Sequence, residues 1–121
     1  MPHGAKAYGA VARQIASPRD WEASLLLKAA ARLQAVSDTW PNGKSDLDSA
    51  LLFNRKLWTI FLDSAMSEES PMPTEIRKNI ATLGAFVMRQ TMATTSDPKP
   101  ERLGALININ RQIAAGLRGQ S

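Results

Sequence analysis

The chain has 121 residues, of which 44% are hydrophobic and 21% are charged, and its net charge at neutral pH is +4. This length and composition suit one globular domain over residues 1–121, which can bury about two-thirds of its unfolded surface. The sequence contains no cysteine, which excludes a disulfide framework and a thiolate metal site. His3 is the only histidine, so a zinc site or a serine–histidine pair would depend on that residue alone.

The hydropathy and charge patterns bear on location and partners. No run approaches the roughly 18 apolar residues that span a bilayer, and the N-terminus lacks an apolar run of signal-peptide length. We therefore expect a cytoplasmic protein without membrane insertion. The net charge is +2 over residues 1–40, −2 over 41–70 and +4 over 71–121. A nucleic-acid site is compatible with the basic C-terminal part, but solvated helix faces are the favoured interpretation.

The first half of the chain predicts three helices, because apolar residues recur three and four apart between glycine- and proline-containing breaks. Residues 5–15 indicate a short first helix that carries Tyr8. A longer helix starts near Pro18 and ends before the break at 41–43. Its expected buried face consists of Trp21, Leu25, Ala29, Leu33, Val36 and Trp40, widened by Leu26, Leu27 and Ala30. The third helix begins with Ser45 as its candidate cap and has a broad apolar face.

The second half predicts two further helices. The fourth begins with Pro73 in its first turn and ends near Met92, before a break at 94–100. The fifth carries apolar residues from Leu103 to Leu117, and a glycine just beyond it is a natural stop. The expected fold is therefore all-α, a compact bundle of four main helices plus the short N-terminal helix.

Three of these helices repeat one design, an apolar stripe interrupted by an asparagine. The stripes are residues 51–61, 76–83 and 106–113, and the asparagines are Asn54, Asn79 and Asn110. An asparagine buried without a hydrogen-bond partner costs roughly 1–3 kcal/mol. The asparagines could therefore join in a buried network that fixes the register of the helices. They could instead face a partner protein.

The candidate partner-binding residues follow from the second interpretation. Trp58 lies four residues after Asn54, hence on the same helix face, and tryptophan and arginine are enriched at interface hot spots. The candidates are Tyr8, Asn54, Arg55, Trp58, Ile109, Asn110, Arg111 and Ile113. The alternative places Trp58 in the core with Asn54 bonded to a neighbouring helix. Similarly, methionines 66, 72, 88 and 92 either fill gaps in the core or line an adaptable groove.

No group of residues has the pattern of a catalytic site. The acidic pairs Asp46/Asp48 and Glu68/Glu69 fall at a helix start and in a loop, where capping and solvation explain them. The sequence has no glycine-rich phosphate-binding loop. We expect a protein that is not an enzyme and that uses no cofactor or metal.

The residues of the helices carry a family resemblance. Segments 17–19, 25–33 and 51–61, then Pro73, 75–77, 79–80 and Leu83, and finally 106–107, 109–111 and 113–117 resemble the flagellar biosynthesis regulator FlaF of alphaproteobacteria. The short motifs occur in the same order over nearly the whole chain.

The resemblance implies a positive regulator of flagellin synthesis and export. Proteins of this kind plausibly bind flagellin as a chaperone, and an all-helical body can hold an amphipathic partner helix in an apolar groove. A second hypothesis is that the protein binds the regulator FlbT and relieves repression of flagellin translation. A third is direct RNA binding, which the scarcity of aromatic residues off the apolar stripes makes less attractive.

Overall fold

The protein is a four-helix bundle over the residues that its computed structural model describes, 18–70 and 72–119. The long helices are α2 (Pro18–Asp38), α3 (Leu47–Met66), α4 (Thr74–Ser96) and α5 (Leu103–Leu117). Two short 3₁₀ helices, η1 (Asn42–Asp46) and η2 (Pro100–Arg102), precede α3 and α5. The all-α prediction is confirmed. The expected short helix over residues 5–15 lies outside the described residues.

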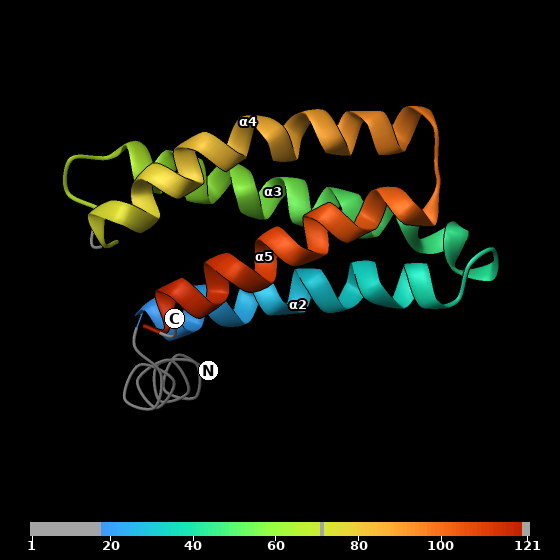
Figure 1. The fold of residues 1–121 in the computed structure, drawn as a ribbon, viewed down its shortest axis with the longest axis horizontal. Coiled ribbons are helices and arrows are strands. Elements are labelled where there is room, and N and C mark those ends of the chain that lie inside the picture. Colours follow the sequence, from blue (N-terminus) through green and yellow to red (C-terminus); the bar gives the residue numbers. More distant parts are fainter. Residues whose placement is uncertain (1–17, 71, 120–121) are drawn as a thin grey trace, which may run out of the picture.

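Each helix runs antiparallel to the one before it, so that the chain goes up, down, up and down (Figure 1). Helix α2 packs most extensively on α5, and α3 on α4, while α2–α3 and α4–α5 contacts close the ring. The start of α2 and the end of α5 lie side by side at one end of the bundle. There Arg118 Nη2 donates to Ser24 Oγ at 3.1 Å, and Arg118 Nε lies 3.9 Å from Asp20 Oδ1.

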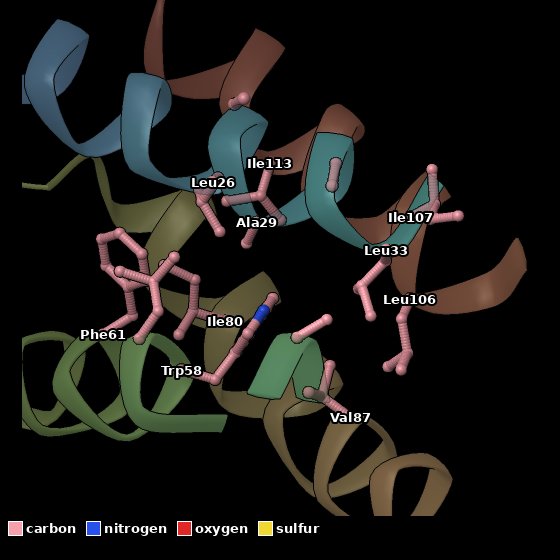
Figure 2. Close-up of a cluster of buried hydrophobic side chains, with 14 of the residues drawn as sticks. Leu26, Ala29, Leu33, Trp58, Phe61, Ile80, Val87, Leu106, Ile107 and Ile113 are labelled. Carbon is pink, nitrogen blue, oxygen red and sulfur yellow. The ribbon is translucent and has the colours of Figure 1, made fainter. Parts of the chain in front are cut away.

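The core is an apolar cluster to which all four helices contribute, as Figure 2 shows. Apolar residues three and four apart fall on the inward face of each helix because an α-helix turns once every 3.6 residues. The largest fully buried side chains include Trp58 of α3, Ile80 of α4, and Leu26, Leu33, Leu103 and Leu106 of α2 and α5. The stripes predicted for α3, α4 and α5 supply core residues, although Leu52 and Ile60 of the first stripe are exposed and Ile76 and Leu83 of the second are half-buried.

The predicted inner face of α2 is partly wrong. Trp21 is 53% exposed and Leu25 is half-buried, whereas Ala23, Leu26 and Ala30 are buried. A strict repeat of four residues rotates by about 40° at each step, because four residues exceed one turn of 3.6. The repeat that begins at Trp21 therefore starts outside the core and enters it only further along the helix.

Two predicted helix ends also need correction. Helix α4 continues to Ser96 rather than ending near Met92. The hydroxyls of Thr91, Thr94 and Thr95 donate to backbone carbonyls four residues earlier, so these side chains are satisfied within the helix. Ser45 is not the cap of α3, because it lies within η1. Its Oγ donates to Asn42 O instead.

Arg77 ties the start of α4 to the end of α3. Its Nε donates to Ala65 O at 3.0 Å, and its Nη2 donates to Ser67 O at 2.9 Å. A guanidinium at this position satisfies carbonyls that the helix leaves without partners and complements the negative end of its dipole. The tight connection between α3 and α4 keeps these helices paired.

Replacement by alanine should change the free energy of unfolding in opposite directions at two glycines. A Cβ at Gly43 would lie 2.7 Å from the carbonyl oxygen of Val36, a backbone atom that cannot move aside cheaply, and would also clash with Thr39 Oγ1. We expect Gly43→Ala to lower the free energy of unfolding by about 1–3 kcal/mol. A Cβ at Gly104 meets nothing within 4 Å, and Gly104→Ala should raise it by up to about 0.5–1 kcal/mol. Urea denaturation measures both, and equal effects would contradict this account of Gly43.

Candidate functional site

A buried hydrogen-bond network links α3 to α5. Trp58 Nε1 donates to Asn110 Oδ1 at 2.8 Å, and Asn110 Nδ2 donates to Asn54 Oδ1 at 2.7 Å. All three side chains are fully buried. Helices α3 and α5 lie across the bundle from each other, each flanked by α2 and α4. The network therefore fixes the register of two helices that share few other contacts.

Half of the candidate partner-binding residues are core residues. Asn54, Trp58 and Asn110 form the network, and Ile113 is buried among the apolar side chains of the same core. In the folded protein these side chains are not available to a partner, because the apolar stripe on which they lie is the inward face of its helix. Asn79 is exposed and takes no part in the network.

The remaining candidates lie on different faces. Arg55 is exposed on the α4 side of α3, whereas Arg111 is exposed beside α2, where its Nη2 donates to Gln34 Oε1 at 3.5 Å. Ile109 is half-buried and packs against the core. Tyr8 lies outside the described residues. The structure therefore does not bring the candidates together into one site, although Arg55 belongs to the surface described next.

An apolar groove runs between α3 and α4. We call it the α3–α4 groove, and it encloses about 430 Å³ between Asp48, Leu51, Leu52, Arg55, Thr91, Met92, Thr95 and Ser96. Leu52 is 40% exposed and Met92 is 70% exposed, so both present apolar surface to solvent. A second hollow of about 490 Å³ continues from Arg55 over Lys56, Thr59, Ile60 and Met88. The hydrophobic periodicity misses this groove because its walls are the outer flanks of two helices.

The chemistry of the groove suits an amphipathic partner helix. Methionine side chains adapt to differently shaped apolar groups, and Met88 and Met92 line the two hollows. Met72, by contrast, is buried in the core, so both interpretations of the methionines occur. Among the described residues no carboxylate forms an ion pair with Arg55. The groove thus combines exposed apolar walls with a cation that lines both hollows.

The carboxyl group of Glu22, on α2, is partly withdrawn from water, and its Oε1 has no hydrogen-bond partner. Burial raises the pKa of Glu22 above the ordinary value of 4.5, while the charge of Arg19 opposes the shift. The folded protein thus retains this proton to a higher pH than the unfolded chain does. This contribution to stability therefore falls as the pH rises from about 4.5 through the raised pKa.

Replacing Glu22 with glutamine should therefore stabilise the protein at neutral pH, because the variant has no charge to desolvate. The gain over the unmodified protein should disappear as the pH falls below 4.5, where both the folded and the unfolded chain hold the proton. Thermal denaturation of both proteins between pH 3.5 and 7.5 tests this. A gain that is equally large at the two ends of the range would show that Glu22 acts through something other than its charge.

Within residues 18–70 and 72–119, no three histidine, cysteine, aspartate or glutamate side chains gather as they would around a metal ion. No helix in that part of the chain is both long and apolar enough to cross a membrane.

The fold and its surfaces define a small helical-bundle protein whose distinctive polar residues organise the core and whose exposed apolar surface lies in a groove between helices. The family model for the flagellar protein FlaF matches residues 4–117, nearly the whole chain. The protein therefore belongs to the FlaF family, as the resemblance of its helical segments predicts. No curated protein and no solved structure matches the chain.

Proposed function

We propose that this protein is a cytoplasmic chaperone for flagellin that promotes the synthesis and export of flagellin. It holds a helical segment of flagellin in the α3–α4 groove and thereby keeps that segment from assembling early. Membership of a flagellar protein family supports the choice of flagellin as the partner. The all-helical architecture supports helix-in-groove binding as the mode, since such grooves take the apolar face of an amphipathic helix.

The exposure of Leu52 and Met92 on facing flanks of α3 and α4 is the observation that carries this proposal. Large apolar side chains at the rim of a groove lose solvent contact when a partner helix covers them, which favours binding by roughly 25 cal/mol per Å² buried. Arg55 lines the same hollow as these apolar side chains and can pair with an acidic side chain of the bound helix. The groove therefore supplies both affinity and orientation.

Calorimetric titration with cognate monomeric flagellin, at 50 and 500 mM salt, tests the proposal. We expect saturable binding that changes little with salt and a negative heat-capacity change, because apolar burial dominates. Binding that collapses at high salt would contradict an apolar groove and favour phosphate contacts, as in direct RNA binding. No binding to flagellin would shift the role to that of a regulator that binds an FlbT-like protein.

A further inference from the structure

A second surface of mixed apolar and cationic character lies on the other side of α3, along its seam with α2. We call it the α2–α3 strip, and it consists of Trp21, Leu25, Lys28 and Arg32 of α2 and Phe53 of α3. The α2 members recur at intervals of four, three and four residues, so they follow one helix flank.

Two cations of α2 share one aromatic ring of α3. Arg32 Cζ lies 5.0 Å from the centre of the Phe53 ring, and Lys28 Nζ lies 5.7 Å from it. Arg32 Nη2 also donates to Ser49 Oγ at 3.4 Å. Each cation is attracted to the negative face of the ring. The ring therefore holds two like charges close together at the surface.

Trp21 and Leu25 extend the strip toward the start of α2. Trp21 is 53% exposed and Leu25 is half-buried, which makes them the apolar end of the strip.

The positive charge of the strip is not neutralised by the protein itself. Among the described residues, neither Lys28 nor Arg32 forms an ion pair with a carboxylate. Asp46 lines the hollow next to Arg32 but lies beyond ion-pair distance. Two adjacent cations repel each other, so a partner that brings negative charge to them lowers the free energy of the complex.

We propose that the α2–α3 strip is a second docking surface, independent of the α3–α4 groove, for an acidic amphipathic helix of a partner protein. The partner's apolar residues cover Trp21 and Leu25, and its carboxylates pair with Lys28 and Arg32. Charge complementarity selects this occupant over a second copy of the chain, because a symmetric dimer through the strip would face its cations against each other.

The test uses two synthetic helix-forming peptides with the same leucine face, one with glutamate and one with lysine on its polar face. We expect the glutamate peptide to bind and the lysine peptide not to bind. Trp21 is exposed whereas Trp58 is fully buried, so binding should shift the tryptophan emission to shorter wavelength. The Trp21→Phe variant should lose the larger part of that shift while calorimetry still detects binding.

Charge reversal locates the binding. The double variant Lys28→Glu/Arg32→Glu should weaken binding of the glutamate peptide by about tenfold or more. The matched control is Lys78→Glu/Arg89→Glu, which changes two exposed cations of α4 and alters the net charge equally. The control should bind as the unmodified protein does. Equal weakening in both variants would reduce the effect to overall charge and overturn the proposal.

Other occupants would give different results, each of which overturns the proposal. If binding of polyuridine or of phosphatidylglycerol vesicles requires Lys28 and Arg32, and binding of the glutamate peptide does not, the strip is a site for nucleic acid or for a membrane surface. Dimerisation in analytical ultracentrifugation that the double variant abolishes would assign it to a second copy. Leu52→Glu/Met92→Glu, which alters only the groove, should leave peptide binding intact and thus separates this proposal from the proposed function.

Discussion

Replacing Trp58 with alanine should lower the free energy of unfolding by about 3–5 kcal/mol, the largest stability effect expected of a single substitution in this protein. Trp58 is fully buried and is the largest of the buried side chains. Its removal leaves a cavity between α3 and the facing helices, and it leaves Asn110 Oδ1 without its donor. Urea denaturation followed by circular dichroism measures the loss.

A double-mutant cycle can separate packing from hydrogen bonding at this position. Trp58→Phe keeps an aromatic ring but removes the donor, and Asn110→Ala removes the acceptor and the bond to Asn54. Because the two residues share a hydrogen bond, the double variant should lose less stability than the sum of the single losses. Strictly additive losses would show that the network contributes packing alone.

The double variant Leu52→Glu/Met92→Glu should abolish flagellin binding, with a loss of affinity of about 100-fold or more, while the protein stays folded. Charged groups at these two positions would have to be desolvated against the apolar face of the partner helix. Leu52 and Met92 are 40% and 70% exposed, so the change removes little from the core. Calorimetry gives the affinity, and far-ultraviolet circular dichroism reports the fold.

A charge-matched control accompanies the groove variant. Asn108→Asp/Gln112→Glu adds the same negative charge on the exposed face of α5, away from the groove. This control should bind flagellin as the unmodified protein does. If the groove variant is folded and binds with unchanged affinity, flagellin occupies another surface and the α3–α4 groove is excluded as its site.

The core network and the outer surfaces have different roles in this small protein. Asn110 bonds to both Trp58 and Asn54 inside the bundle and thereby sets the register of α5 against α3, although Asn54 Nδ2 has no partner of its own. A fixed register in turn sets which outer flanks of α3 face α2 and α4. The positions of the α3–α4 groove and the α2–α3 strip therefore depend on residues that are buried in the core.

Much of the fold follows from the sequence alone. The spacing of apolar residues in α3, α4 and α5 predicts helices and their inward faces, because burial of one helix face requires that period. Proline and glycine mark the breaks. The four-residue spacing of Trp58 and Asn54 on one face also makes a buried network one of two possibilities, since a polar group in an apolar stripe needs a partner.

The packing of the helices determines whether each asparagine is buried or exposed. It also determines which helix flanks together form the outer surfaces. Periodicity describes one helix at a time, so it cannot tell that Asn110 reaches Asn54 while Asn79 stays exposed. Nor can it tell that Trp21 lies outside the core, because the face of α2 is set by the helices that pack on it. Grooves and strips belong to pairs of helices, and their residues come together only when the bundle closes.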